Sequence, residues 1–304
     1  MKIVFMGTPD FAVESLKALC DNGYDVAAVV TMPDKPSGRG QKINKSAVKI
    51  YAEEHGLRIL QPEKLKDETF IATLREINAD LQVVVAFRML PEIVWSMPKH
   101  GTINVHASLL PQYRGAAPIN WAVMNGDKQT GVTTFKLKHE IDTGDILMQR
   151  AVDILPDDNA GTIHDKLMYM GGELLLDTVK AIAEGRSVEQ SQNLLAEGVI
   201  LRHAPKIFKD DMRIDWNDTT ENIHNKVRGL SPYPAAWTEI KETTIKIFRT
   251  KKGTKADLPA GEIATDNKTY LEIGTADGSL SIEELQMAGK KRMDIKTFLM
   301  GCKL

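Results

Sequence analysis

The chain has 304 residues, 42% of them hydrophobic and 26% charged, which is ordinary for a water-soluble protein with room for two domains. Its 39 basic and 41 acidic side chains leave a net charge of −2, which argues neither for nor against an anionic partner. The two cysteines, Cys20 and Cys302, exclude a disulfide framework, and no stretch approaches the roughly 20 apolar residues of a membrane span. The first apolar run ends at Gly7, too early for a signal peptide, so we expect a cytoplasmic protein.

The first half of the chain alternates apolar strands with amphipathic helices. The run KIVFM at 2–6 is typical of a parallel strand covered on both faces, and the turn GTPD at 7–10 leads into a helix expected over 11–22. Further strands are expected at 26–31, 81–87, 101–106, 132–137 and 146–152, with further helices at 46–56 and 164–185. This order predicts an α/β fold with a doubly wound, mostly parallel, Rossmann-like sheet.

The sequence changes character near Phe208. From there a helix expected at 221–229 is followed by short β-rich pieces separated by Gly, Asp and Lys, as in a small antiparallel barrel of the OB type. Residues 186–207 are polar and have no sustained period. We therefore expect a catalytic domain over 1–189, a linker over 190–207 and a β-barrel over 208–304.

Glycine motifs for nucleotide cofactors are missing. The first strand–turn–helix unit has a single glycine, Gly7, where a dinucleotide site has G-x-G-x-x-G. The stretch SGRG at 37–40 is not followed by the Gly-Lys-Ser/Thr of a phosphate-binding loop. The sequence therefore argues against a dinucleotide or nucleoside triphosphate cofactor.

Asn104 and His106 end the strand predicted at 101–106. Alternation puts both on one face of the strand, and burying such a pair is costly unless both side chains are hydrogen-bonded or used in function. Two satisfied polar groups therefore remain one interpretation. Three features favour a site instead: the carboxyl end of a strand in an open α/β sheet, the loop SLLPQYRGAAP that follows, and Asp142 and Asp145 in the segment HEIDTGDIL.

An amide, an imidazole and a carboxylate together suit the attack of an amine on a carbonyl-like carbon. Asn104 can donate to the developing oxyanion, and His106 can donate or accept a proton near neutral pH, with a carboxylate such as Asp142 to orient it. No serine or cysteine is an obvious nucleophile, so direct transfer is the economical mechanism. A zinc site of His106, His139 and Asp142 is conceivable, but no recognised ligand spacing is present and we expect no metal.

The segment MPDKPSGRGQKIN at 32–44 is basic and far longer than most βα connections. It can be a solvated run of charges. Its glycine-flanked Arg39, with Lys42 close by, and its place at the same edge of the predicted sheet favour contact with RNA phosphates. Such contact needs a local basic surface rather than a basic protein.

Several motifs together resemble the methionyl-tRNA formyltransferases, which are among the enzymes that use 10-formyltetrahydrofolate. These motifs are GTPDFA (7–12), DKPSGRGQK (34–42), INVHASLLPQYRGAAPINWA (103–122), IDTGDIL (141–147), SPYPAAWT (231–238) and AGKKRMDIKTFLMG (288–301). The resemblance extends over essentially the whole chain. It implies transfer of the formyl group of 10-formyltetrahydrofolate to the α-amino group of methionyl initiator tRNA, for translation initiation.

The resemblance also implies roles for particular residues. Asn104, His106 and Asp142 match the catalytic residues, and Arg39 matches the basic residue of the loop that enters the acceptor end of the tRNA. The residues expected at the folate site are Phe87, Arg88, Met89, Leu90, Ser108, Leu109, Leu110, Pro111 and His139. The residues expected to contact tRNA are Arg39, Lys42, Lys206, Lys209, Lys290, Lys291 and Arg292.

Two other functions remain open. A formyltransferase for a small sugar-phosphate amine shares the first domain but has no use for the basic segment or the barrel. A non-catalytic RNA-binding module explains those additions but not the set of Asn104, His106 and Asp142. We expect methionyl initiator tRNA and the folate co-substrate as partners, no membrane and no DNA, and a monomer.

Overall fold

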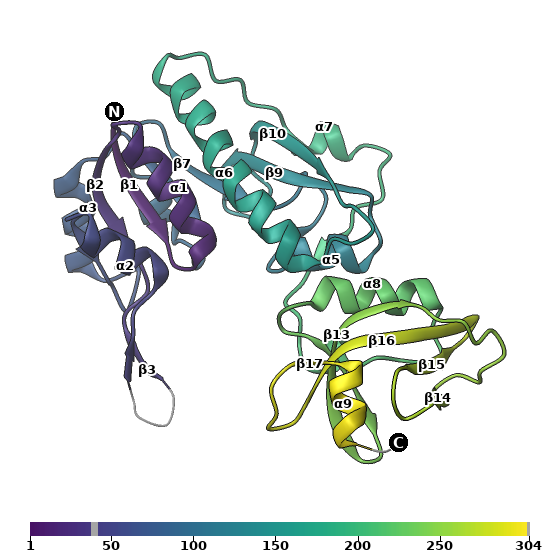
Figure 1. The fold of residues 1–304 in the computed structure, drawn as a ribbon. Coiled ribbons are helices and arrows are strands. Elements are labelled where there is room, and N and C mark those ends of the chain that lie inside the picture. The colour runs from purple at the N-terminus through teal and green to yellow at the C-terminus, as the bar shows by residue number, and fades with distance from the viewer. Residues whose placement is uncertain (38–41, 303–304) are drawn as a thin grey trace. The chain divides into compact units, whose positions relative to one another are not determined.

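The computed structural model describes residues 1–37 and 42–302, which form two compact units (Figure 1). The first unit comprises residues 1–115, 131–152 and 164–203. The second comprises residues 116–130, 153–163 and 204–304. Each unit has its own sheet and its own hydrophobic core, and the two are described separately below.

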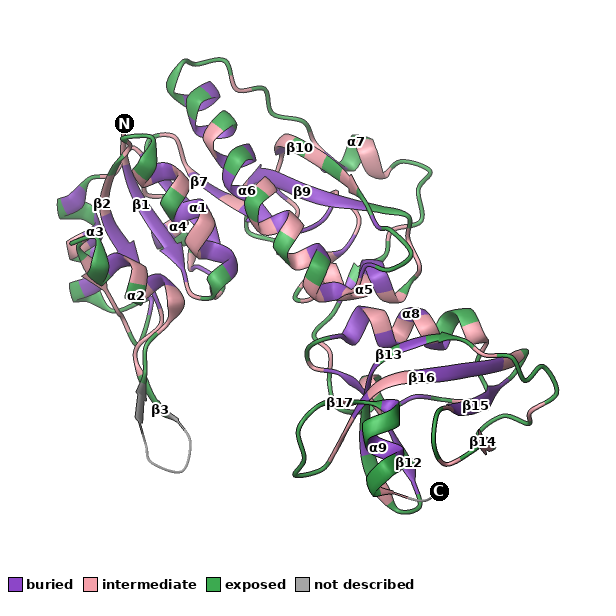
Figure 2. Ribbon diagram, viewed as in Figure 1, coloured by how far each residue is buried: buried purple, intermediate pink, exposed green. Residues whose placement is uncertain are grey.

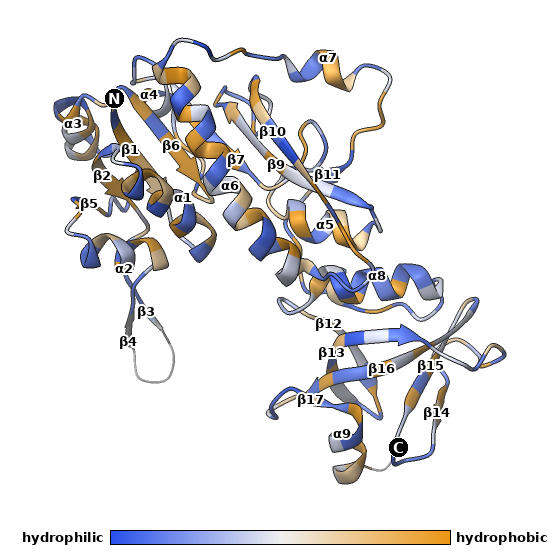
Figure 3. Ribbon diagram, turned by 45° about the horizontal axis from the view of Figure 1, so that its top comes forward, coloured by the Kyte–Doolittle hydropathy of each residue, from blue (hydrophilic) through white to orange (hydrophobic). Residues whose placement is uncertain are grey.

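A seven-stranded sheet in the order β10-β9-β7-β6-β1-β2-β5 forms the centre of the first unit. The strands are β1 (Lys2–Gly7), β2 (Asp25–Val30), β5 (Ile59–Leu60), β6 (Leu81–Val85), β7 (Thr102–His106), β9 (Gln129–Lys136) and β10 (Ile146–Asp153). The first five run parallel to their neighbours, and β9 runs antiparallel to β7. β1 and β6 are buried along almost their whole length, as Figure 2 shows for β1. Both strands are strongly hydrophobic (Figure 3), as expected for central parallel strands.

Helices cover both faces of this sheet. They are α1 (Asp10–Asp21), α2 (Ala47–Glu54), α3 (Glu68–Ile77), α4 (Glu92–Trp95), α6 (Ala160–Ala183) and α7 (Gln192–Ala196). On one face, Leu74 of α3 and Val94 of α4 pack in one cluster with Met6 and Val84. On the other face, α6 approaches closely at Gly171, where an added Cβ would lie 3.2 Å from Val105 Cγ1.

The basic segment expected to be a loop contains two short strands. β3 (Lys35–Ser37) and β4 (Lys42–Asn44) pair antiparallel and form a ribbon that extends from the first unit (Figure 1). The loop prediction was therefore wrong for these backbone segments. The sequence gives little sign of them because each strand is only three residues long.

The second unit is built on an antiparallel half-barrel with the strand order β12-β13-β16-β15-β14 and β17 paired to β16. Its strands are β12 (Ala236–Ile240), β13 (Thr243–Lys252), β14 (Ile263–Thr265), β15 (Leu271–Thr275), β16 (Gly278–Met287) and β17 (Met293–Asp294). Its helices are α5 (Pro118–Met124), the 3-10 helix η1 (Asp210–Met212), α8 (Thr220–Leu230) and α9 (Ile295–Gly301). Val227 of α8 and Phe298 of α9 share a core with Ile247 and Leu285 of the sheet.

The segment 116–130 belongs to this unit because α5 packs tightly on α8. An added Cβ at Gly229 would lie 2.7 Å from the Met124 nitrogen, so only glycine allows this approach. Asn120 donates a hydrogen bond of 2.8 Å to the Gly229 carbonyl. The prediction of an α/β domain followed by an antiparallel β-domain is confirmed. Within the described residues, no helix has both the length and the apolar run needed to cross a bilayer.

Glu272 is a buried carboxylate that closes a turn of the second unit. It is 5% exposed and accepts hydrogen bonds from the Thr254 nitrogen and hydroxyl, the Lys255 nitrogen and the Ser279 hydroxyl. Burial raises the pKa of Glu272, but the hydrogen bonds from Ser279, Thr254 and Lys255 outweigh it, so the pKa lies below its usual 4.5. Ionised Glu272 therefore stabilises the folded state.

Glu272→Gln is expected to destabilise the second unit by about 1–3 kcal/mol at pH 7, because an amide NH2 replaces an oxygen that accepts from these donors. A depressed folded-state pKa contributes stability that is complete above the unfolded-state value of 4.5 and is lost as the pH falls through the lower folded-state value. The gap between wild type and variant should therefore shrink below about pH 4.5. Denaturant unfolding followed by tryptophan fluorescence measures this gap.

The matched control is Glu262→Gln, which removes an exposed carboxylate from the same unit. Equal stability changes for the two variants, or a gap that does not depend on pH, would contradict the role of Glu272.

Candidate active site

The strand β7 brings Asn104 and His106 to the carboxyl end of the sheet. The register pairs Met6 with Val84 and Val84 with Asn104, so these side chains share one face of the sheet. Val105 points to the opposite face, toward α6. Asn104 is half-buried, and His106 is buried, at 7% exposure. The structure thus places the predicted pair on one face of the strand, as alternation requires.

His106 is held by a backbone carbonyl. Its Nε2 lies 2.9 Å from the Tyr113 carbonyl oxygen. A carbonyl can only accept, so Nε2 carries a proton and donates in this hydrogen bond. The second nitrogen, Nδ1, faces Asp142, with 3.8 Å between Nδ1 and Oδ2. In the neutral ring, Nδ1 therefore presents a lone pair beside a carboxylate.

Asp142 is positioned through its backbone and its carboxylate. Its Oδ2 accepts a hydrogen bond of 2.9 Å from the Gly115 nitrogen. Its φ is +55°, and two neighbours of the site, Tyr113 and Ala86, also have positive φ values of +60° and +47°. Residues other than glycine rarely adopt this conformation, and such strain concentrates at functional sites. Ala86 follows β6, the strand next to β7, and Tyr113 and Asp142 both contact His106, so all three lie near the candidate site.

The Asn104 amide is available to a ligand. Among the residues that the structure describes, its side chain has no hydrogen-bond partner, although the residue is half-buried. The amide is not among the buried polar atoms without a partner, so it reaches solvent and can donate to a ligand that displaces water. Asn104, His106 and Asp142 thus combine an unused donor, an imidazole and a carboxylate at one place.

The loop that follows β7 is held by its own polar groups. The Ser108 hydroxyl donates to the Gln112 carbonyl, and the Leu110 nitrogen donates to the Thr133 hydroxyl. The side chains of Ser108, Leu110 and Pro111 are buried, whereas Leu109 is half-buried. Only Leu109, together with backbone groups, can therefore present much surface to a ligand without rearrangement of this loop.

Two loops place apolar side chains on the face of the sheet that carries Asn104. Phe87 and Leu90, which follow β6, and Leu137, which follows β9, all pack in the cluster that lies on the Asn104 face of the sheet. Met89 is 74% exposed and Ile141 is 63% exposed. Exposed apolar side chains on the loop that follows β6 and on the loop that carries Asp142 offer the surface that a flat, partly apolar ligand requires.

Arg88 and His139 take different positions from the apolar residues. The Arg88 guanidinium donates to the carbonyls of Pro62 and Glu63, and burial lowers its pKa. This arrangement directs its charge to those carbonyls. His139 is exposed, and its side chain has no partner among the described residues.

Family models match nearly the whole chain. A model described as formyl transferase matches residues 1–179, and one described as formyl transferase, C-terminal domain, matches residues 206–303. The methionyl-tRNA formyltransferase of Bacteroides fragilis is 55% identical over 307 residues, covering 99% of this chain and 95% of the relative. That of Phocaeicola vulgatus is 58% identical over 310 residues, with the same coverage.

The chain belongs to the methionyl-tRNA formyltransferase family. Its fold is also similar to that of HypX from Aquifex aeolicus, solved in complex with tetrahydrofolic acid, with a TM-score of 0.67 and 18% identity. The match covers 99% of this formyltransferase and 47% of HypX, so the chain spans about half the length of that protein. At this identity the likeness concerns the fold alone.

The residues expected to contact tRNA lie partly outside the described structure. Arg39 is not among the described residues, and the side chain of Lys42 is not described either. In the second unit of this formyltransferase, Lys206 lies 5.6 Å from the ring centroid of the exposed Phe208, and Lys209 lies 5.6 Å from that of Trp237. Both lysines therefore stand beside aromatic rings at the surface.

The three basic residues predicted at 290–292 differ in their contacts. Lys290 and Lys291 are exposed. Arg292 instead forms two hydrogen bonds with the Glu284 carboxylate and lies 4.4 Å from the centroid of Phe248. Its charge is already paired, so the two lysines are the stronger candidates for phosphate contacts.

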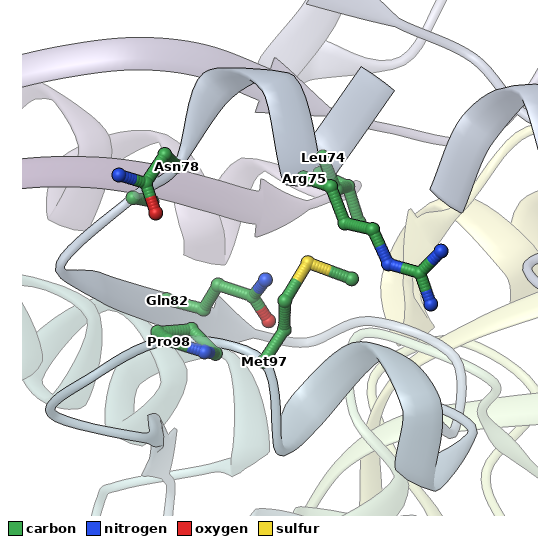
Figure 4. Close-up of a pocket in the computed structure, with 7 residues that line it drawn as sticks. Leu74, Arg75, Asn78, Gln82, Met97 and Pro98 are labelled. Atoms are coloured by element: carbon green, nitrogen blue, oxygen red, sulfur yellow. The ribbon is translucent and has the colours of Figure 1, made fainter. Parts of the chain in front are cut away.

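A small pocket of about 100 Å³ lies elsewhere in the first unit (Figure 4). Gln82, near the start of β6, and Met97, before β7, line it together with the end of α3. Because Asn104 and His106 lie at the opposite end of these parallel strands, the pocket is not part of the candidate site. No group of three or more His, Cys, Asp or Glu side chains suited to a metal occurs in the described part of this formyltransferase.

Tyr113, Gly115 and Gln192 form hydrogen bonds with His106 or Asp142, and the sequence does not predict these contacts. Tyr113 and Gly115 act through a backbone carbonyl and a backbone nitrogen, for which the side-chain type carries no signal. Gln192 is a buried polar residue in the segment expected to be a linker, where polar composition hides it.

Proposed function

We propose that this enzyme transfers the formyl group of 10-formyltetrahydrofolate to the α-amino group of methionyl initiator tRNA, and that Asn104, His106 and Asp142 catalyse the step. Membership of the family supports formyl transfer. The observation that carries the mechanism is the unpartnered Asn104 amide beside the His106–Asp142 pair.

The amine is activated by His106. Nε2 donates to the Tyr113 carbonyl, which leaves Nδ1 as the free acceptor. With 3.8 Å between Nδ1 and Oδ2 of Asp142, one incoming amine can donate to both atoms. As the amine nitrogen forms its bond to the formyl carbon, its proton passes to Nδ1, and the Asp142 carboxylate stabilises the imidazolium that results.

The formyl oxygen becomes an oxyanion in the same step. The Asn104 amide donates to it, and the imidazolium stabilises it electrostatically. The bond between the formyl carbon and N10 of the folate then breaks, and the proton held by His106 moves to N10, directly or through water. The products are formylmethionyl-tRNA and tetrahydrofolate. Because both substrates bind at one site, the step is effectively unimolecular, which is worth up to ~7–11 kcal/mol in favourable cases.

The folate ring system is proposed to lie against the apolar rim. Phe87, Met89, Leu109 and Ile141 offer apolar surface there. The buried Leu90 supports this rim from the core. Arg88 and His139 are assigned to its outer border.

The tRNA is proposed to bind through the segment containing Arg39 and Lys42 and through basic residues of 208–304 and the preceding linker. Lys206 and Lys209 lie beside Phe208 and Trp237, an arrangement that suits phosphate contact next to stacked bases. In this proposal residues 1–189 carry the chemistry, and the enzyme acts as a cytoplasmic monomer that binds neither DNA nor membranes.

A formyl-transfer assay with 10-formyltetrahydrofolate tests the proposed function. The acceptors to compare are methionylated initiator tRNA, methionylated elongator tRNA and glycinamide ribonucleotide. We expect turnover of the initiator tRNA alone. Turnover of the small amine, or of neither tRNA, would overturn the proposal.

Removal of Lys206 or Lys209 is expected to weaken tRNA binding and leave the chemistry intact. Lys206→Ala and Lys209→Ala should each raise KM for the tRNA several-fold at about 0.1 M salt and lower the slope of log KM against log salt by about 1. The kcat should stay near the wild-type value. Lys180→Ala, which removes an exposed lysine of α6, is the matched control. An unchanged KM and salt slope for both lysine variants would rule these contacts out.

A further inference from the structure

Gln192 is almost completely buried, at 1% exposure, and all of its hydrogen-bonding capacity is used within the first unit. Its Oε1 accepts from Nε and Nη2 of Arg114, at 2.9 and 2.7 Å. Its Nε2 donates to the carbonyls of Asp142 and Gly144, at 2.9 and 2.7 Å. These four bonds fix the orientation of the amide, since its oxygen faces only donors and its nitrogen faces only acceptors.

The Gln192 amide is connected to Asp142 in two ways, through its nitrogen and through its oxygen. On one side, Gln192 holds the Asp142 carbonyl itself, at a residue whose φ is +55°. On the other side, it holds Arg114, the neighbour of Gly115, whose nitrogen donates to the Asp142 carboxylate. The segment 142–144 has little freedom of its own, because a Cβ at Gly144 would lie 1.6 Å from the Lys136 carbonyl oxygen.

We infer that Gln192 is a positioning residue, which sets the distance between the Asp142 carboxylate and His106 Nδ1 by fixing the backbone of residues 142–144 and the strand segment β8 (Arg114–Gly115). This inference rests on the proposed function, since it assigns the Asp142–His106 pair to formyl transfer. It gives the segment 190–207 a part in building the catalytic site, in addition to connecting two domains.

Replacement of Gln192 should act on the rate of the chemical step. Gln192→Leu has a similar size but leaves the two carbonyls and the Arg114 guanidinium without their partner. A shift of about 1 Å at a reacting group can cost on the order of 10²-fold in rate, and we expect kcat to fall by that order. KM for each substrate should stay within about threefold of wild type, because the Asp142–His106 pair that Gln192 positions is proposed to act on the reacting atoms in the transition state.

A double-mutant cycle with Asp142→Asn separates positioning from general stability. If Gln192 acts through Asp142, then Gln192→Leu should cost less than about threefold in the Asp142→Asn background. A merely structural loss would be equal in both backgrounds. Gln192→Glu is the conservative second variant: it retains an acceptor for Arg114 but loses the donor to the two carbonyls, and it should also lower kcat.

The control is Gln190→Leu, an exposed glutamine two residues away, which should retain the wild-type kcat. Thermal unfolding of each variant shows that the enzyme measured is folded. Wild-type turnover of the initiator tRNA tests the proposed function by itself. If the wild type is active, a near-normal kcat for Gln192→Leu or Gln192→Glu, or equal losses in both backgrounds, would overturn the role of Gln192 alone.

Discussion

His106→Asn is expected to lower kcat for formyl transfer by roughly 10²–10⁴-fold, the scale of a general acid–base group. In the wild type, His106 Nε2 donates to the Tyr113 carbonyl. The asparagine side chain of the variant can still fill part of the space and donate to this carbonyl. It cannot take the proton from the attacking amine or return it to N10. Steady-state assays with saturating 10-formyltetrahydrofolate and varied methionyl initiator tRNA measure the effect.

The loss should fall on kcat, with KM for the tRNA little changed, because His106 acts on the reacting atoms. His100→Asn is a matched control, since His100 directly precedes the turn into β7 at the other end of the same strand. It should leave kcat unaltered. A kcat for His106→Asn within about threefold of wild type would remove His106 from the proton transfer.

The placement of the three candidate residues could be predicted from the sequence because it depends on local patterns. Alternation along a strand places Asn104 and His106 on one face wherever that strand lies. The third group, Asp142, comes from the DTGD motif, and the structure places it 3.8 Å from His106. Its glycine is explained by the close approach of Gly144 to the Lys136 carbonyl.

The surrounding contacts could not be predicted because they depend on distant backbone groups. The Arg88 guanidinium donates to carbonyls about 25 residues earlier in the chain, and Gln192 bonds to residues some 50 and 78 positions away. No periodicity or motif specifies such pairings. The buried state of Ser108 and Leu110 likewise follows from the packing of their loop on β9, so a residue within a matching motif need not face the ligand.

The secondary structure shows the same division. α3 has a clear helical period and an N-cap at Asp67, both of which are visible in the sequence. It is nevertheless missing from the helices expected from the sequence. α5 has only seven residues, begins with Pro118 and follows a Gly/Ala/Pro-rich stretch, which reads as a loop. Its helix is stabilised by α8, a partner about 100 residues later in the chain.

Asn104→Ala is expected to lower kcat by about 10²–10³-fold, equivalent to about 2.7–4 kcal/mol of lost transition-state stabilisation. The oxyanion forms only as the amine attacks, so its donor matters little for the binding of either substrate. Asn104→Asp should be worse than Asn104→Ala, because a carboxylate would face the developing negative charge and the Asp142 carboxylate at the same site. Single-turnover rates with a preformed complex of the enzyme and 10-formyltetrahydrofolate measure the chemical step directly.

For Asn104, a loss of rate can be separated from a loss of stability. The amide has no hydrogen-bond partner among the described residues, so its removal breaks no bond that stabilises the folded protein. The midpoint of thermal unfolding should therefore change little while the rate falls by orders of magnitude. A large loss of stability would show that the amide serves the fold, and a rise in KM with unchanged kcat would show that it binds substrate and transition state equally. A large loss of rate at nearly constant stability is expected only if the half-buried amide is kept free for the oxyanion.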